Sequence, residues 1–441
     1  MTAPLLHILS ATDCPQHADT VVIGGGIVGV STAYWLARAG QKVVLLEKGR
    51  IGAEQSSRNW GWCRQQNRDA RELPLSRVSL SLWEEMMQDC GAEIGFRRCG
   101  LIYLSNDEAE IEGWARWGHF ARGEGVDTRM LTATEAAEHG AATGQAWKGG
   151  VWSPTDGIAD PAAAAPMIAQ GIVKHGGIVL QGCAARGLET SGGAVSAVVT
   201  EKGVIQTKQV VLSGGAWAGS FLHQLGIFFP QSSVRSSILS VAPGAQGLPD
   251  AVHTKEVSVT RRGDGGYTLA ISGLAKVDPT PRMLRGSKHF LPMFLRRWRS
   301  LAPGGPQAWR CNFDGLKKWR LDQPTPMEHM RILDPRPDAP TIAKTLAQGR
   351  QLFPALQNVP LQASWAGYID STPDGVPVID SDIGMPGLAL AAGLSGHGFG
   401  IGPGVGHLMA DMVLGRTPVT ETAQYKLSRF AKSQWGKVSE F

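Results

Sequence analysis

Residues 19–29, with the sequence DTVVIGGGIVG, decide the fold of this 441-residue chain. The apolar residues 21–23 predict a buried strand, and the glycines after them lead into a helix expected over residues 27–39. A second strand is predicted at residues 42–46, and Glu47 follows it. This strand–helix–strand unit carries the Gly-x-Gly-x-x-Gly turn of a dinucleotide site. The helix N-terminus faces the diphosphate, and the acid accepts hydrogen bonds from a ribose diol.

A second glycine-rich segment lies near the other end of the chain. Residues 393–406 read GLSGHGFGIGPGVG, and we expect a helix over about residues 403–414 with Pro403 in its first turn. The positive end of that helix is suited to negative charge on a bound group. Two glycine-rich segments at opposite ends of the sequence favour a large dinucleotide gripped twice, which indicates FAD rather than NAD.

Composition excludes several classes of function. The net charge is +5 and basic residues are scattered, which disfavours a nucleic-acid partner. The six cysteines form no C-x-x-C pair, which disfavours zinc ribbons and thioredoxin-like chemistry. No metal site is predicted, and the cysteines are expected to be reduced. The N-terminus lacks the features of a signal peptide, and no run of 18 apolar residues occurs. We therefore expect a cytoplasmic protein without a spanning helix.

The pattern of strands and helices predicts an α/β fold in two parts. Further helices are expected over residues 71–90 and 161–175, with a strand at 96–104 and helical material at 107–140. Buried strands return at residues 178–180 and 209–212, whereas residues 230–345 contain strand-like patches at 257–260 and 267–271. We predict a Rossmann-like FAD-binding domain from residues 18–92, 148–228 and 346–430. A mainly antiparallel sheet with helices, from residues 93–147 and 229–345, is predicted to be inserted as the substrate-binding domain.

Five further segments complete a family pattern. They are SSRNWGWCR at residues 56–64, SGGAW at 213–217, WAG at 365–367, TPDGVPVI at 372–379, and the GHGF of the second glycine segment. Together with the first glycine turn and Glu47, they resemble the D-amino-acid oxidase family of FAD enzymes over nearly the whole chain. This family includes glycine oxidase, sarcosine oxidase and D-amino-acid dehydrogenase.

The resemblance implies an enzyme that oxidises the C–N bond of an amino acid or secondary amine. A hydride passes to flavin N5, and the imine is then hydrolysed. The expected cofactor contacts are Gly24, Gly26, Ile27, Val28, Gly29, Glu47, Lys48, Ser56, Ser57, Arg58, Asn59, Gly61, Trp62, Gly214, Gly215, Trp217, Gly367, Gly396, His397, Gly398, Phe399, Gly400 and Ile401.

Three departures from sarcosine oxidases are visible. Gly400 stands where those enzymes carry a substrate-binding lysine, and no lysine precedes the Gly266-Tyr267 pair. The covalent flavin cysteine would fall near Gly367, where no cysteine occurs. The FAD is therefore expected to be non-covalent and the substrate to differ from sarcosine. The electron acceptor stays open between O2, a quinone and a partner protein.

Substrate carboxylates are commonly held by arginine as a bidentate fork. The expected substrate contacts are Arg64, Trp62, Arg262, Tyr267 and Trp365, with Arg58 and Arg261 as further arginines; a solvated surface arginine is the alternative for each. No catalytic residue is certain, and the candidates are Arg64, His397 and Lys276.

Other readings are a 2-hydroxy acid dehydrogenase that uses FAD, a flavin subunit of a multi-component amine or opine dehydrogenase, and an NAD-binding protein. The second glycine segment argues against the last of these.

Residues 288–299 form a basic, amphipathic segment. It fits either a peripheral contact with a membrane surface or a domain helix with a solvated basic face. A helix is expected here over residues 288–300, beginning at Pro292 if that proline would otherwise be internal.

Overall fold

The computed structural model describes residues 3–306, 308–309 and 313–431. Its nucleotide-type sheet has six strands in the order β20-β21-β12-β1-β2-β8. The predicted strand–helix–strand unit is its centre, because β1 pairs in parallel with β2 on one side and with β12 on the other. The strands are β1 Thr20–Ile23, β2 Val43–Leu46, β8 Ile178–Leu180, β12 Val210–Leu212, β20 Val378–Asp380 and β21 Leu388–Ala392.

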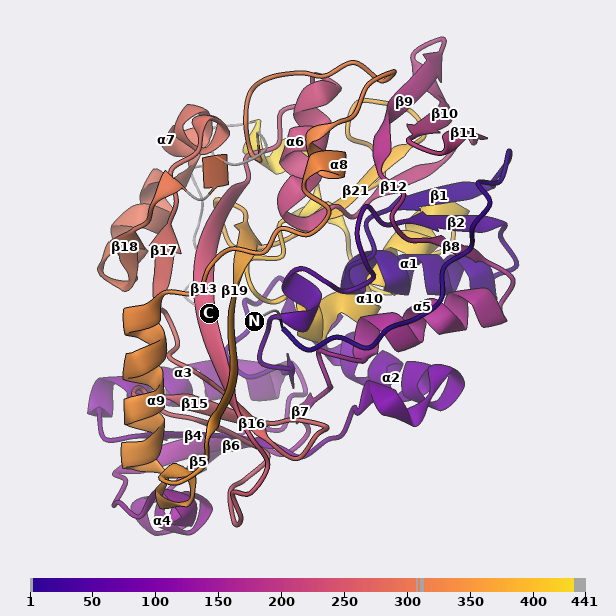
Figure 1. The fold of residues 1–441 in the computed structure, drawn as a ribbon. Coiled ribbons are helices and arrows are strands. Elements are labelled where there is room, and N and C mark those ends of the chain that lie inside the picture. Colours follow the sequence, from indigo (N-terminus) through magenta and orange to yellow (C-terminus); the bar gives the residue numbers. More distant parts are fainter. Residues whose placement is uncertain (1–2, 307, 310–312, 432–441) are drawn as a thin grey trace.

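A second, larger sheet contains ten strands and is mainly antiparallel, as predicted. Its longest pairing joins β13 and β19, from Ser232 opposite Ser371 to Val241 opposite Leu361. Figure 1 shows these two long strands running from the six-stranded sheet to the far end of the molecule. The strands are β4 Leu101–Ser105, β5 Arg129–Leu131, β6 Gly149–Ser153, β13 Ser232–Val241, β14 Ala251–His253, β15 Ser258–Arg261, β16 Tyr267–Ala270, β17 Ala275–Val277, β18 Leu301–Pro303 and β19 Leu361–Ser371.

Two small sheets complete the strands. One is the antiparallel β11-β10-β9 sheet, and the other pairs β3 with β7. Their bounds are β9 Ala185–Ser191, β10 Ala194–Thr200, β11 Gly203–Gln206, β3 Trp62–Cys63 and β7 Gly157–Ile158. Strands β6 and β19 belong to the large sheet, although their residues fall within the segments predicted for the FAD-binding domain. The predicted boundaries thus do not separate the two sheets at β6 and β19, and the division into domains stays a prediction.

Four helices pack together beside the six-stranded sheet, and Figure 1 shows α1, α10, α5 and α2 grouped there. Val30, Ile168 and Val405 are fully buried among them. The helices are α1 Ile27–Arg38, α2 Leu73–Cys90, α3 Glu108–Gly123, α4 Ala133–His139, α5 Ala164–Lys174, α6 Ala218–Gln224, α7 Pro281–Arg297, α8 Pro326–His329, α9 Ala339–Leu352 and α10 Gly398–Leu414.

The prediction for α10 was wrong at its start, because the helix begins at Gly398 and Pro403 lies inside it. Proline disturbs the helical hydrogen bonds around it. Here α2 supplies replacements: Ser79 Oγ accepts from the Gly404 N–H at 2.9 Å, and Trp83 Nε1 donates to the Gly400 carbonyl at 2.9 Å. These are the two backbone groups that would pair with each other in a regular helix.

The prediction for α7 was also wrong at its start. The helix begins at Pro281, and Thr280 caps it by accepting from the Met283 N–H at 3.2 Å. A threonine cap followed by proline at the first helical position is the usual start signal. Pro292 lies inside the helix.

The stretch at residues 96–140 is more broken than predicted. Strand β4 begins only at Leu101, and β5 separates α3 from α4. Similarly, α5 begins at Ala164 rather than at residue 161. The five described cysteines are free thiols, and Cys311 lies outside the described residues.

Helices α1 and α10 touch through backbone at Gly406. A Cβ at this position would lie 2.6 Å from the Ser31 carbonyl carbon and 2.6 Å from the Thr32 nitrogen. We expect Gly406→Ala to lower the free energy of unfolding by at least 1–3 kcal/mol, roughly the cost of overpacking a core. Chemical denaturation measures this. Gly123→Ala is the control, since nothing lies within 4 Å of a Cβ there; equal stability of the two variants would contradict the packing argument.

Candidate active site

A cavity of about 880 Å³ opens where β1, β2 and β12 end. The glycine turn lines one part of it, Glu47 and Lys48 follow β2, and Gly214, Gly215 and Trp217 follow β12. Ligands of parallel α/β sheets bind at this edge, outside the carboxyl ends of the strands. The structure thus brings together the predicted contacts from the first glycine segment, Glu47, Lys48, Ser56 and the 214–217 turn.

Glu47 is held by backbone donors. Its two oxygens accept from the Gly25 N–H at 2.8 Å and from the Gly49 N–H at 2.7 Å. Burial raises the pKa of Glu47, while the neighbouring Lys48 and the two backbone N–H groups oppose that shift. The carboxylate is therefore fixed in place beside the end of β2, where an acceptor for a ribose diol is needed.

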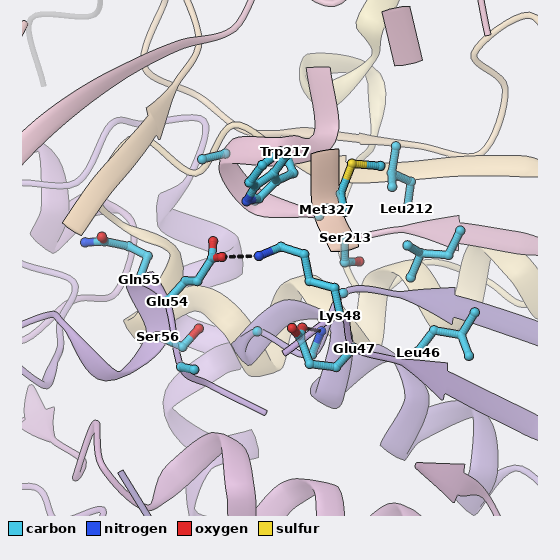
Figure 2. A pocket seen from close by; sticks show the side chains of 18 of the residues that line it. Leu46, Glu47, Lys48, Glu54, Gln55, Ser56, Leu212, Ser213, Trp217 and Met327 are labelled. Atoms are coloured by element: carbon cyan, nitrogen blue, oxygen red, sulfur yellow. Dashed lines mark hydrogen bonds and ion pairs between the residues drawn. The ribbon is translucent and has the colours of Figure 1, made fainter. Parts of the chain in front are cut away.

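Three residues that line the cavity carry a buried polar atom that lacks a partner. Ser213 Oγ, Trp217 Nε1 and Gln55 Oε1 are buried without a hydrogen bond, and all three residues line the cavity. Lys48 pairs with Glu54 at 2.5 Å, and its ammonium lies 4.9 Å from the centre of the Trp217 ring. Figure 2 shows this ion pair and the Trp217 ring. Buried polar groups are normally bonded. Lys48, Glu47, Glu54, the Trp217 ring and the glycine turn all line this one cavity. A cation, carboxylates, an aromatic ring and a helix N-terminus together fit a nucleotide with hydroxyl and phosphate groups.

The loop after β2 contributes Glu54, Gln55 and Ser56 to the cavity lining, and the residues that follow hold the loop in place. Ser56 Oγ accepts from the Ile27 N–H at 2.8 Å at the start of α1. Ser57 is buried. Arg58 is also buried, donates to the Ala366 carbonyl and pairs with Asp334 at 2.8 Å. Asn59 Oδ1 accepts from the Gly61 N–H. In this structure Arg58 and Asn59 hold the loop and the strand of Gly367.

The second glycine segment lies apart from that cavity. A Cβ on Gly400 would lie 2.8 Å from the Trp62 carbonyl oxygen, so this glycine lets α10 sit directly on β3. His397, just before α10, lines two large cavities of about 1610 Å³ and about 2090 Å³. Both also include Met293 and Arg297 of α7, so this helix forms a common wall of the two.

Arg64 shares the smaller of these two cavities with His397. Its Nη1 donates to the Gln66 carbonyl at 2.8 Å and to the Tyr103 hydroxyl at 2.9 Å. The guanidinium lies 5.8 Å from the centre of the Trp62 ring. One nitrogen thus anchors the guanidinium while Nε and Nη2 have no partner among the described residues.

The remaining predicted residues lie elsewhere. Lys276 pairs with Asp338 at 2.7 Å and lines a separate, smaller cavity of about 420 Å³. Tyr267 and Trp365 are buried in the large sheet, and Arg262 lies 5.8 Å from the Trp365 ring centre. The structure does not bring these four side chains into the cavities lined by His397.

The sequence patterns missed several residues at the site. Asp370 lines the cavity at the ends of β1, β2 and β12 and accepts from the Gly393 N–H at 2.7 Å. Its pKa is raised to about 6, chiefly by burial. Tyr103 holds Arg64, and Glu72 bonds His397 at 2.9 Å. None of the three stands in a glycine motif, and only their positions in space associate them with the site.

The family model described as "DAO: FAD dependent oxidoreductase" matches residues 19–412. The chain belongs to this family. It is 25% identical over 420 residues to glycine oxidase of Geobacillus kaustophilus, covering 93% of this chain and 97% of that protein. It is 24% identical over 435 residues to sarcosine oxidase subunit beta of Rhizobium meliloti, covering 95% and 90%.

Solved structures of the family agree. L-amino acid deaminase from Proteus myxofaciens, in complex with anthranilate, matches with a TM-score of 0.91 at 27% identity, covering 98% of this chain and 97% of that one. L-proline dehydrogenase from P. horikoshii matches with a TM-score of 0.77 at 25% identity, covering 95% and 99%. The resemblance read from the sequence is confirmed. The protein is an FAD-dependent oxidoreductase of the amino-acid and amine-oxidising class.

Among residues 3–306, 308–309 and 313–431, no helix combines the length and the apolar character that a membrane crossing requires.

We expect Glu47→Gln to weaken FAD binding at least about 10-fold, equivalent to about 1.4 kcal/mol. The amide cannot accept from both the Gly25 and Gly49 N–H groups, and it removes an acceptor from the ribose position. Titration of apoprotein with FAD, followed by flavin fluorescence, measures the dissociation constant. Glu108→Gln, at a side chain 76% exposed, is the control; unchanged binding by Glu47→Gln would contradict the assignment.

The buried His253 should make the free energy of unfolding depend on pH in acid. Burial and, to a smaller extent, the positive charge of Arg64 lower the pKa of His253 from an ordinary value of 6.5 to about 3. The unfolded chain therefore binds a proton that the folded protein does not, and stability falls as the pH drops from about 6.5 towards 3. The slope from this residue is at most about 1.4 kcal/mol per pH unit. Urea denaturation across this range should show a shallower slope in His253→Gln, and an unchanged slope would refute the prediction.

Proposed function

We propose that the protein oxidises an amino acid at its C–N bond to an imine, which water hydrolyses to a keto acid or aldehyde. FAD, when bound, supplies the hydride acceptor. The observation that carries the proposal is that Arg64 and His397 face one cavity beside the start of α10. An arginine and an imidazole in one cavity match the two ends of an amino acid, its carboxylate and its amine.

Arg64 would hold the carboxylate. Its two free nitrogens, Nε and Nη2, form one edge of the guanidinium, which is the geometry of a bidentate carboxylate pair. The Tyr103 hydroxyl and the Gln66 carbonyl fix the opposite side of the group. A fixed carboxylate orients the carbon that loses the hydride, and such positioning is a large part of catalysis in reactions of this type.

His397 would act on the amine. Burial lowers the pKa of His397, and the charge of Arg68 lowers it further. The imidazole is therefore neutral near pH 7 and can accept a hydrogen bond, and then a proton, from the substrate ammonium group. Loss of that proton favours the neutral amine, from which a hydride leaves more readily.

The FAD is proposed to be non-covalent, since Gly367 occupies the position near which family members carry their flavin cysteine. The acceptor is proposed among O2, a quinone and a partner protein. The Rhizobium relative is named as a subunit, so a multi-component enzyme remains the alternative. Helix α7 exposes Leu291 and Phe294, and Trp298, directly after the helix, is exposed as well. A peripheral membrane contact through this face stays a prediction, as does a cytoplasmic location.

Anaerobic mixing with substrates tests the reaction itself. We expect the yellow colour of the bound FAD to bleach with D- or L-amino acids or N-methyl amino acids, and not with 2-hydroxy acids. Bleaching by hydroxy acids alone would replace this proposal with the hydroxy-acid alternative. Rapid peroxide formation in air by the isolated chain would exclude an obligatory partner protein.

Arg64→Lys tests the carboxylate site. Lysine keeps the charge but loses the planar fork, so we expect KM to rise about 10- to 100-fold, because one bidentate charged pair is worth roughly 1.5–3 kcal/mol. Steady-state kinetics on an amino acid that bleaches the enzyme measure this. Arg129→Lys is the control, since Arg129 pairs with exposed Asp127 at 2.8 Å, lies over the Trp152 ring and lines neither of the cavities with His397. A wild-type KM in Arg64→Lys would place the carboxylate elsewhere.

A further inference from the structure

A buried acid stands behind His397. Glu72 immediately precedes α2, and its side chain is 0% exposed. One of its carboxylate oxygens lies 2.9 Å from Nδ1 of His397, whose own side chain is 26% exposed. Both residues line the smaller cavity, but only the histidine side chain is exposed there, while the carboxylate that bonds it is shielded from water.

This hydrogen bond determines which imidazole nitrogen carries the hydrogen. A carboxylate accepts, so Nδ1 must donate, and in the neutral ring Nε2 then keeps its lone pair. Nε2 has no hydrogen-bond partner among the residues that the structure describes. The exposed part of the ring therefore offers an acceptor to whatever enters the cavity.

The geometry of the pair is set by helix packing. Glu72 precedes α2 and His397 precedes α10. These two helices are joined by the hydrogen bonds from Trp83 to the Gly400 carbonyl and from the Gly404 N–H to Ser79, each 2.9 Å long. Glu72 makes no side-chain cap on α2, so its carboxylate is not needed to begin that helix. The side chain is buried without a structural hydrogen bond apart from the one to His397.

The charges around the pair act in opposite directions. Burial and Arg68 lower the pKa of His397, whereas the charge and hydrogen bond of Glu72 raise it. Arg68 is itself buried, and its Nη1 and the second Glu72 oxygen, Oε1, have no hydrogen-bond partner. The other charged side chains that line the two cavities with His397 are Arg64, Asp69, Glu110, Arg116, Lys288, Arg296, Arg297 and Asp374.

We infer that Glu72 is a positioning residue, which holds His397 with Nδ1–H towards itself and the Nε2 lone pair towards the substrate amine. The proton of the substrate ammonium group passes to Nε2, leaving a neutral amine and an imidazolium. Glu72 stabilises that imidazolium through Nδ1–H. No other bond forms or breaks in this step. The inference rests on the proposed function for the role of the amine, but the state of the ring is measurable without substrate.

Nitrogen-15 NMR of the FAD-bound enzyme, labelled at histidine, tests the assignment. The His397 signals are found among those of the 11 histidines by comparison with His397→Gln. Above the pKa, we expect the Nδ1-protonated tautomer. In Glu72→Gln, we expect the His397 pKa to fall by about one unit or more, because an opposite charge at this distance typically shifts a pKa by 1–3 units. An Nε2-protonated ring, or an unchanged pKa, would overturn the inference.

A second histidine–carboxylate pair provides the matched control. His407 and Asp411 lie on α10, 3.2 Å apart. Asp411→Asn should alter the His407 signals and leave those of His397 unchanged. If Asp411→Asn moved the His397 pKa as much as Glu72→Gln does, the effect would belong to the helix and not to Glu72, which would also overturn the inference.

Kinetics separate positioning from structural support. In Glu72→Gln, we expect the acid limb of kcat/KM against pH to move to lower pH, and kcat to fall more than KM changes. Glu72→Asp keeps the charge, so it should restore part of kcat and part of the shift of the acid limb. It also replaces Glu72→Gln as the test variant if Glu72→Gln does not fold. An unshifted acid limb in a folded variant would contradict the role. If NMR shows the predicted tautomer but no amine bleaches the flavin, the proposed function fails and the assignment of Glu72 stands.

Discussion

The close approach of α1 and α10 is the constraint on which the rest of the structure depends. Gly406 brings the two backbones into contact at Ser31 and Thr32, and Gly402 packs on Ile27. Helix α1 carries the nucleotide turn at its start, and α10 carries His397. Because both helices are fixed against each other, the two ends of the sequence present their N-termini in one fixed arrangement. A large side chain in this contact would move the two N-termini relative to each other.

Around this contact, three polar side chains of the site are each held in place by a partner within the protein. The Gly25 and Gly49 N–H groups hold Glu47, Tyr103 holds Arg64, and Glu72 holds His397. Such supports fix side-chain orientation before a ligand arrives, which limits the entropy that binding must remove.

The sequence predicted those parts of the molecule that depend on local pattern. The β1–α1–β2 unit and the turn after β12 follow from glycine spacing and strand periodicity, whereas the family was recognised by resemblance to motifs spread along the chain. The beginning of α10 did not follow, because the groups that Pro403 disturbs are bonded by Ser79 and Trp83 of another helix. Glu72 was missed for a related reason: it lies 325 residues from His397 and looks like an ordinary acid before a helix. Lys276 was named as a catalytic candidate because no lysine precedes Gly266-Tyr267, yet an ion pair with Asp338 holds it.

The central claim is that Arg64 and His397 bind the two ends of one substrate beside the flavin. A crystal structure of the FAD-bound enzyme with an amino acid or an unreactive analogue, obtained without oxygen, tests it most directly. We expect the carboxylate on Nε and Nη2 of Arg64 and the amine nitrogen within about 3.2 Å of His397 Nε2, which is hydrogen-bond reach. A ligand bound beside the flavin but out of contact with Arg64, or with its amine turned away from His397, would contradict the account.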